Sequence, residues 1–191
     1  MSKQAKTLTP QELRRVLDYI ATRPHAARNR AVLLLLYYAG LRVGEAASLR
    51  VADVTDAQGQ VLSEFVLRAD QTKGCHARTV FVSEKLRKEL TTYLSATPAL
   101  KPKHKLFYSQ KAVSDGFTAN TLAQHFHYLY KRADIVGASS HSTRRTFITN
   151  LAAQGISVRV LASLAGHRSL QTTMGYIDAN DDMKRRAVEL V

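Results

Sequence analysis

Residues Ala26–Ala39 form the stretch that most constrains the fold, because apolar side chains occupy nearly every position from Val32 onward. A helix that is apolar on all sides is stable only where the protein buries it on all sides. Gly40 follows directly, and glycine is the usual residue at which a helix ends. The apolar run Ala31–Leu41 is too short to cross a bilayer. The sequence therefore predicts a globular fold with this helix in its core.

Further helices are predicted from their start and stop signals. Thr9-Pro10-Gln11-Glu12 is a capping box with proline at the first helical position, and it predicts a helix from Pro10 to Thr22. The remaining predicted helices are a short one that opens at 41–45 and ends near Leu49, one from Ser83 to Ala96, one capped by Thr118, one from Ser140 to Gln154, one between Ser157 and Gly166, one that starts at Ser169 and carries Tyr176, and a last one from Asn180.

Between residues 60 and 82 the apolar pattern changes to that of strands. The segments 61–67 and 79–82 are rich in β-branched and aromatic residues, and a polar segment with Gly74 separates them. This pattern predicts a small antiparallel hairpin with Lys73 at its tip, and Leu106–Tyr108 is predicted as a short extended piece. The fold class is therefore mainly α with a small antiparallel β-sheet. Pattern alone leaves open whether Lys73 has a function or is merely solvated.

The charge balance indicates an anionic partner. The chain has 28 lysines and arginines against 15 aspartates and glutamates, a formal net charge of +13, spread over the whole sequence. A folded domain this basic usually meets a polyanion, so we expect nucleic acid. The alternatives are a merely basic soluble protein and a protein that binds an anionic membrane, and no amphipathic lipid-binding face supports the second. Charge does not separate a DNA-binding protein from an enzyme.

Cysteine and histidine usage argues against a metal centre. The single cysteine, Cys75, excludes an internal disulfide and a cysteine-based zinc site. His125 and His127 are two residues apart in a predicted helix and point to different faces, so we expect no shared metal and no cofactor. No N-terminal signal pattern is present, so a cytoplasmic location is expected. Residues 9–191 are expected to form one domain behind a tail or linker at 1–8.

The segment from His141 to Tyr176 contains the residues best suited to phosphate chemistry. His141 and Arg144 are three residues apart at a predicted helix start, so they share one face. A helix N-terminus favours a phosphate, an arginine binds it through two parallel hydrogen bonds, and a histidine moves protons near neutral pH. His167 follows a helix-ending glycine, and Tyr176 offers an oxygen nucleophile.

Two interpretations of these residues stay open at this point. A transferring phosphoryl group gathers negative charge, which arginines and protonated donors can meet without a metal. The combination of arginine, histidine, lysine and tyrosine therefore suits metal-free phosphoryl transfer. The same side chains would equally serve a helical DNA-binding protein that contacts the backbone. Arg42, held where the core helix ends, is either part of such a site or a surface arginine near a turn.

Four segments together resemble one known family. They are GLRVGEAASLR (Gly40–Arg50), TKGCHARTVFV (Thr72–Val82), HSTRRTF (His141–Phe147) and LAGHRSLQTTMGYI (Leu164–Ile177). In this order and spacing, the chain from about Thr9 to Val191 is similar to the catalytic domain of the tyrosine recombinases, or phage-type integrases. The resemblance implies the DNA breaking-rejoining fold of that family.

The resemblance implies which residues would hold the scissile phosphate. Arg42 looks like the first catalytic arginine of the family and Arg144 like the second, and both would bind the non-bridging oxygens. His167 looks like the position that hydrogen-bonds the phosphate. Glu45 matches an acidic position that supports the arginine loop. Arg145 stands where many relatives have histidine, a change that should be tolerated.

The resemblance also implies the chemical roles. Tyr176 looks like the nucleophile, His141 like the residue that helps to remove its proton, and Lys73 like the lysine that protonates the departing 5′-oxygen. The implied reaction forms a 3′-phosphotyrosyl link and a free 5′-hydroxyl, and needs neither ATP nor a metal. A partner strand then attacks the link, which in the family takes four protomers on two DNA sites.

The alternatives to a site-specific recombinase are a type IB topoisomerase-like enzyme and a catalytically idle DNA-binding regulator of the same fold. Family members usually carry a helical core-binding domain ahead of the catalytic one, and here only eight residues precede the first helix. We therefore expect either a solo domain, as in the fimbrial-switch inversion recombinases, or a piece of a longer protein. A solo domain would lose half of the clamp on DNA, so for it an accessory DNA-bending or core-binding partner is expected. The C-terminal Met183–Val191 packs either on a neighbouring protomer or on its own domain.

Overall fold

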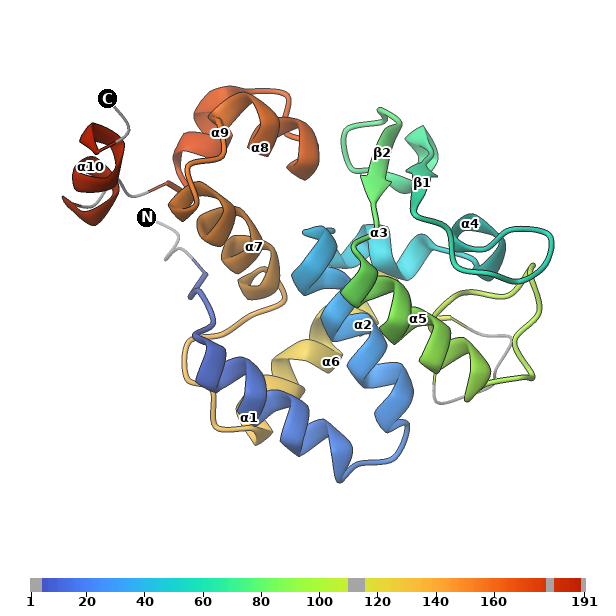
Figure 1. Cartoon of the computed structure of the whole chain (residues 1–191). Helices are drawn as coiled ribbons and strands as arrows, with labels where there is room; N and C mark the ends of the chain where they lie inside the picture. The colour runs from blue at the N-terminus through green and yellow to red at the C-terminus, as the bar shows by residue number, and fades with distance from the viewer. Residues whose placement is uncertain (1–4, 110–115, 178–180, 190–191) are drawn as a thin grey trace.

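The computed structural model describes residues 5–109, 116–177 and 181–189. It is mainly helical with one two-stranded sheet (Figure 1). The elements are α1 (Pro10–Ala21), α2 (Ala26–Ala39), α3 (Val43–Ser48), α4 (Val51–Val54), β1 (Glu64–Leu67), η1 (Ala69–Gln71), β2 (Arg78–Phe81), α5 (Glu84–Ser95), α6 (Ala119–Arg132), α7 (Ser142–Ala153), α8 (Val158–Ala165), α9 (Leu170–Met174) and α10 (Asp181–Val188). No helix in these ranges is long and apolar enough to span a membrane.

Helix α2 is the centre of the core, as its composition predicts. Leu33, Leu35 and Leu36 are fully buried, and α1, α3, α5 and α7 all pack against this helix (Figure 1). The helix ends at Gly40, which adopts a left-handed conformation with φ of 62°. The predicted fold class and the predicted role of Gly40 are therefore confirmed.

The predicted capping box at the start of α1 is also present. The Thr9 hydroxyl accepts from the Glu12 backbone N–H at 3.2 Å, and the Glu12 carboxylate accepts from the Thr9 N–H at 2.9 Å. Leu8, just before the cap, is buried in the core, and its backbone N–H donates to the hydroxyl of Thr146 in α7 at 2.8 Å. The start of α1 is thus fixed against the C-terminal half of the chain.

The hairpin forms, but its first strand is shorter than predicted. β1 pairs antiparallel with β2, with Phe65 opposite Val80 on the buried face. Val61 forms only an isolated bridge with Thr55, because the Asp56 side chain accepts two backbone N–H bonds and closes a tight turn there. The predicted extended piece Leu106–Tyr108 likewise forms only isolated bridges at its flanks. The short helix α4 and the turn η1 are not predicted from the sequence.

The C-terminal helices follow the predicted order, with one correction. Helix α9 ends at Met174, so Tyr176 lies in the turn after the helix and not in it. The reason is that the Tyr176 and Ile177 N–H groups bond to the carbonyls of Thr173 and Met174, three residues back, which closes a turn and ends the helix. The predicted start of the last helix at Asn180 lies outside the described residues.

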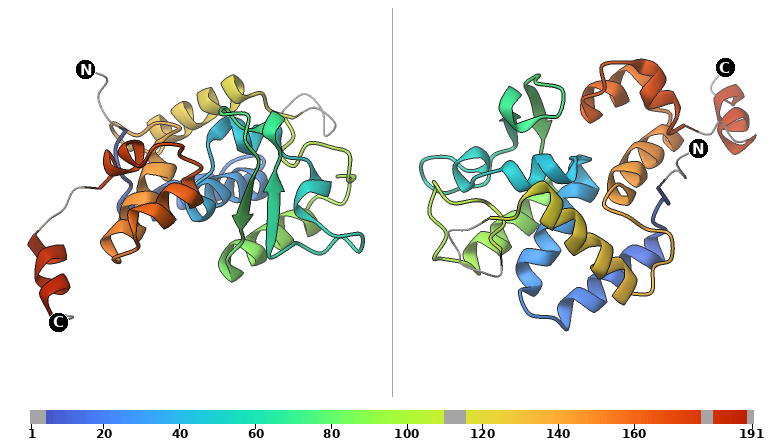
Figure 2. Two further views of the ribbon diagram at one scale, coloured as in Figure 1. Left: turned by 90° about the horizontal axis from the view of Figure 1, so that it is seen from above. Right: turned by 180° about the vertical axis from the view of Figure 1, so that it is seen from behind.

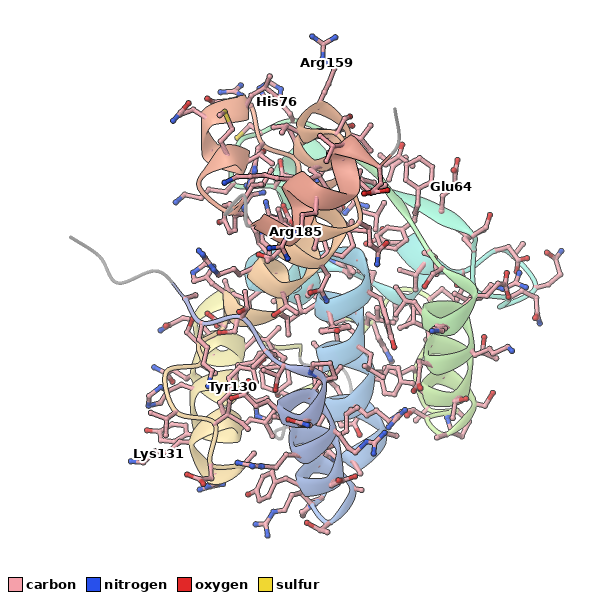
Figure 3. All side chains as sticks on the ribbon, turned by 60° about the vertical axis from the view of Figure 1, so that its left-hand side comes forward. Glu64, His76, Tyr130, Lys131, Arg159 and Arg185 are labelled. Carbon is pink, nitrogen blue, oxygen red and sulfur yellow. The ribbon has the colours of Figure 1, made fainter. Side chains whose placement is uncertain are left out.

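The hairpin and the α8–α9 pair stand at the same end of the molecule. In Figure 1 the hairpin lies above α3 and the α8–α9 pair above α7, and the view from behind shows both at the same end (Figure 2). With all side chains drawn, His76 of the hairpin connection and Arg159 of α8 lie at this end, whereas Tyr130 and Lys131 of α6 lie at the opposite end (Figure 3). The segments that carry the predicted site residues therefore meet at one end of the fold.

Candidate active site

The end of α2 brings together two of the predicted site segments. A Cβ atom on Gly40 would lie 2.3 Å from the Phe147 ring, so only glycine lets α7 approach here. Arg144 of α7 donates from Nη1 to the Gly40 carbonyl at 2.7 Å. Arg42 follows two residues after Gly40, directly before α3. The packing of α7 on Gly40 thus sets the positions of both arginines.

Glu45 is a buried carboxylate shared by two arginines. It is 2% exposed, and its Oε1 accepts from Arg42 Nη1 at 3.0 Å. Its Oε2 accepts from the Arg42 backbone N–H at 2.8 Å and from Arg78 Nη2 at 2.7 Å. The sequence pointed to Glu45 and Arg42 but missed Arg78. A signal was available, since Arg78 is two residues from the inward-facing Val80 and so lies on the same face of β2.

Arg144 is the most deeply buried of the predicted site residues with a positive charge, at 3% exposure. Besides Gly40, its guanidinium donates from Nη2 to the Ala165 carbonyl at 2.6 Å and lies 2.8 Å from His167 Nε2. Burial lowers the pKa of Arg144, and the neighbouring charge of Arg42 lowers it further. Even so, an arginine with a lowered pKa keeps its charge at neutral pH.

The contacts of His167 fix its protonation state. A guanidinium has no acceptor, so Nε2 must accept from Arg144, and Nδ1 then carries the proton. That Nδ1–H donates to the hydroxyl of the buried Thr173 at 2.9 Å. Burial first, and then the charges of Arg144 and Arg42, lower the pKa of His167 to about 4. The imidazole is therefore neutral at pH 7 and held in one tautomer.

Tyr176 lies directly beside this histidine. Its ring stacks on the His167 ring with centroids 5.5 Å apart, and the guanidinium of Arg145 lies over the tyrosine ring at 5.7 Å. The Tyr176 carbonyl accepts from the Thr149 hydroxyl of α7 at 3.2 Å. The turn that follows α9 is thus tied to α7, which also carries Arg144.

His141 and Lys73 lie at the rim of the cluster. His141 is exposed at the start of α7, and the Ser139 hydroxyl accepts from its backbone N–H at 3.3 Å. Desolvation lowers the pKa of His141 below 6.5, and the charges of Arg144, Arg42 and Lys73 lower it further. Lys73 is exposed in the hairpin connection, and no ion pair joins it to another described residue. Among the described residues, Arg42 contacts Glu45, and Arg144 contacts His167, on which Tyr176 stacks. Neither His141 nor Lys73 is bonded to these five residues.

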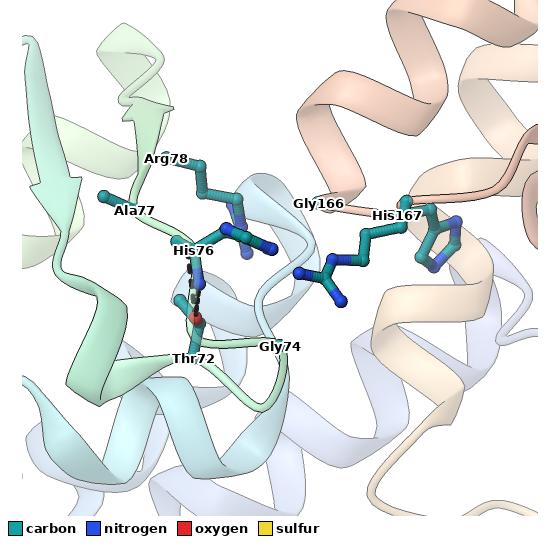
Figure 4. A pocket seen from close by; sticks show the side chains of 8 residues that line it. Thr72, Gly74, His76, Ala77, Arg78, Gly166 and His167 are labelled. Atoms are coloured by element: carbon teal, nitrogen blue, oxygen red, sulfur yellow. Dashed lines mark hydrogen bonds between the residues drawn. The ribbon is translucent and has the colours of Figure 1, made fainter.

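A pocket of about 230 Å³ opens between the hairpin connection and the turn from α8 to α9 (Figure 4). No acidic side chain lines it, and its lining residues are Thr72, Gly74, His76, Ala77, Arg78, Gly166, His167 and Arg168. No group of three or more metal-ligating side chains occurs among the described residues. The cluster of arginines, a neutral histidine and a tyrosine beside a cationic pocket suits the binding of a phosphodiester.

The sequence profile of the phage integrase family matches residues 6–183. The chain belongs to the phage integrase family. The match covers every residue of the cluster described above, from Arg42 to Tyr176, so the site lies within the matched part of the chain.

Among curated members of the family, the tyrosine recombinase XerA of Thermococcus kodakarensis is 31% identical over 187 residues. The alignment covers 96% of this chain and 62% of the XerA chain. Transposase A from transposon Tn554 of Staphylococcus aureus is 29% identical over 95% of this chain and 51% of its own. The chain therefore spans about half to two thirds of the length of these relatives.

Solved structures of integrase-family proteins share the fold. A crystal structure of XerA recombinase matches with a TM-score of 0.77 and 28% identity, over 100% of this chain and 66% of that one. The Tn1549 transposon integrase in complex with transposon right end DNA matches with a TM-score of 0.75 and 21% identity, over 100% of this chain and 67% of that one. The mainly helical fold with its small sheet is thus that of the tyrosine recombinase catalytic domain.

Proposed function

We propose that this chain is the catalytic domain of a site-specific DNA recombinase that cleaves and rejoins DNA through a covalent link to Tyr176. The observation that carries the proposal is the stack of the Tyr176 ring on His167, whose Nε2 accepts from the buried Arg144. A DNA-binding protein needs cations near the phosphate, but it does not need a tyrosine packed against them. The family membership and the names of the relatives support the same activity.

The proposed phosphate site uses Arg42 and Arg144. Both are held by bonds to buried partners, so they present their remaining N–H groups without a large loss of side-chain entropy on binding. His167 lies between Arg144 and the tyrosine, where it supports the guanidinium and the ring together. The negative charge that develops on the phosphate oxygens is met by these fixed donors.

In the proposed step, the Tyr176 hydroxyl oxygen attacks the phosphorus and forms a phosphotyrosyl bond to the 3′ side of the strand. The tyrosine proton passes to His141, which can accept it because its lowered pKa keeps it neutral at pH 7. The bond to the 5′-oxygen breaks, and Lys73 gives that oxygen a proton. A 5′-hydroxyl then attacks the phosphotyrosyl bond, and Tyr176 recovers its proton. Each step exchanges one phosphoester for another, so no ATP and no cofactor enter.

The proposed substrate is double-stranded DNA, which fits the formal net charge of +13. Exchange between two duplexes would take four protomers on two DNA sites, with residues 9–191 as the catalytic unit and 1–8 as a linker. A core-binding segment or a DNA-bending partner would supply the remaining contacts to the duplex. Such a substrate agrees with the cytoplasmic location expected from the sequence.

The test replaces the nucleophile alone. Tyr176→Phe should abolish the covalent adduct with a nicked duplex while DNA affinity stays nearly unchanged, because one hydroxyl contributes little to a binding energy dominated by phosphate contacts. Tyr128→Phe, which removes the hydroxyl of an exposed tyrosine in α6, is the matched control and should cleave like the wild type. Adducts are read on denaturing gels and affinity by fluorescence anisotropy. A Tyr176→Phe variant that still forms the adduct contradicts the proposal.

A further inference from the structure

Three consecutive backbone carbonyls at the end of α8 each accept a hydrogen bond from a different arginine. The pairs are Leu164 with Arg78 at 3.2 Å, Ala165 with Arg144 at 2.6 Å, and Gly166 with Arg42 at 3.4 Å. The last carbonyls of a helix lack partners within it, and they form the negative end of its dipole. The end of α8 therefore serves as a common anchor for three arginines from three separate segments.

Glu45 is the carboxylate that two of these arginines share. It lies between Arg42 and Arg78 and bonds to both, at 3.0 Å and 2.7 Å. Two positive charges are thus balanced by one negative charge in a buried place, which leaves the group with a net positive charge. Arg42 Nη1 bonds to Oε1 and Arg78 Nη2 to Oε2, so Arg78 offsets part of the negative charge that Arg42 would otherwise face alone.

The Arg78 side chain is too deeply buried to act simply as a DNA contact. Its side chain is only 11% exposed, and its Nε is buried without a hydrogen-bond partner among the described residues. A Cβ atom on Gly166 would lie 2.6 Å from both Cδ and Nε of Arg78, so glycine at 166 is what lets the arginine pass. The close-up of the pocket shows Arg78 between the hairpin and the Gly166–His167 segment (Figure 4).

We propose that Arg78 is a positioning residue for the reaction of Tyr176, an inference that rests on the proposed function. Its two bonds join three parts of the site: the hairpin that carries Lys73, the Glu45 carboxylate, and the end of α8 next to His167. Its charge also keeps Glu45 from pairing with Arg42 alone. Without Arg78, the Glu45 carboxylate pairs with Arg42 alone, and the hairpin loses its hydrogen bond to the end of α8.

The primary test separates binding from chemistry. Arg78→Gln should lower the single-turnover cleavage rate at saturating protein by about 10-fold to 100-fold, by analogy with groups that orient metal-ligating side chains. DNA affinity should change little, because the side chain is buried. Arg78→Lys keeps the charge and should recover part of the rate. Arg87→Gln removes an exposed arginine that pairs with Glu84 in α5, and should behave as the wild type.

A double-mutant cycle tests whether Arg78 acts through Glu45. The effect of Arg78→Gln on the cleavage rate should be smaller in a Glu45→Gln background than in the wild type, because the competition for the carboxylate is already gone. Equal effects in both backgrounds contradict the proposal. Circular dichroism melts identify a variant that fails to fold, and Arg78→Lys then provides the comparison.

Two failures are distinguishable in this design. A wild-type chain that forms no adduct at Tyr176 contradicts the proposed function itself. A wild type that forms the adduct, with an Arg78→Gln variant that cleaves equally fast at saturation, contradicts only the positioning role. An Arg78→Gln variant that loses affinity while its rate at saturation is unchanged would make Arg78 a binding residue, and it overturns the inference as well.

Discussion

The two histidines of the candidate site lie in different surroundings, which suit them to different chemical roles. His167 is fixed by Arg144 on one ring nitrogen and by Thr173 on the other, so it has no free nitrogen with which to move a proton. His141 is exposed at the start of α7, and its pKa is lowered below 6.5. We therefore propose that His167 supports the phosphate site and that His141 transfers the proton.

Lys73 makes the sharpest prediction at the level of one residue. If it protonates the departing 5′-oxygen, Lys73→Ala should slow cleavage of ordinary DNA by about 10²-fold to 10⁴-fold. A substrate with sulfur in place of that bridging oxygen has a leaving group that needs no proton, since a thiol is far more acidic than an alcohol. On this substrate Lys73→Ala should cleave nearly as fast as the wild type.

Single-turnover rates on the two substrates, measured at saturating protein, provide the check. Lys88→Ala is a suitable control, because Lys88 is an exposed lysine of α5. A loss that is equally large on the sulfur substrate would contradict the role of Lys73 as proton donor and leave it a binding or structural role.

At the scale of secondary structure elements, the site depends on how α7 packs against the end of α2. The sequence predicts that α2 ends at Gly40, because glycine after an apolar helix is a local signal. It does not predict that Phe147 lies against this glycine, since that contact joins residues far apart in the chain. The same distinction explains why the capping box of α1 is predicted and the partner of Arg78 is not.

Gly40→Ala should therefore lower the free energy of unfolding by more than the cost of holding an alanine in a left-handed conformation. The substitution adds strain at φ of 62° and a Cβ atom 2.3 Å from the Phe147 ring. The expected loss is about 2 to 5 kcal/mol, the sum of the conformational and overpacking costs. Gly59→Ala is the matched control, because Gly59 has φ of 78° and nothing within 4 Å of an added Cβ.

The control should lose only about 1 to 2 kcal/mol. Urea unfolding measures both free energies of unfolding. Equal losses for the two variants would contradict the argument that the approach of α7, and with it the position of Arg144, requires a glycine at position 40.

At the scale of the whole molecule, the sequence was enough to predict the family and the fold class, but not how the side chains of the site are arranged. Four short segments and the basic charge were enough to identify the family domain that the profile then matched at residues 6–183. The convergence of Arg42, Arg78 and Arg144 on the end of α8 could not be found in this way. Their contacts depend on how α2, α7, α8 and the hairpin pack together, which no local pattern encodes. The sequence pointed to Tyr176 but placed it in a helix, whereas it lies in the turn after α9.

The pH dependence of stability is a prediction for the whole fold. Burial first, and then nearby cations, lower the pKa of both His125 and His167 to about 4, whereas each would titrate near 6.5 in the unfolded chain. Between these values the unfolded state binds more protons than the folded state, so stability should fall as pH decreases from 6.5 to 4. Above 6.5 the contribution is fully present.

Thermal unfolding midpoints across this pH range give the measurement. His125→Phe should reduce the slope, because the ring packs between Phe117 and Phe126 and phenylalanine does not titrate. His127→Phe, at an exposed position in the same helix, should leave it unchanged. A slope unaffected by His125→Phe would show that His125 is not buried in its neutral form.

Covalent trapping tests the central claim most directly. The wild-type chain is incubated, with EDTA present, with nicked duplexes tiled from the DNA that flanks its own gene, then denatured in SDS, and the DNA-linked peptide is mapped by mass spectrometry. The account predicts an adduct on Tyr176, joined through a 3′-phosphate and formed without a divalent metal. An adduct on another residue, or none on any duplex that the protein demonstrably binds, would contradict it.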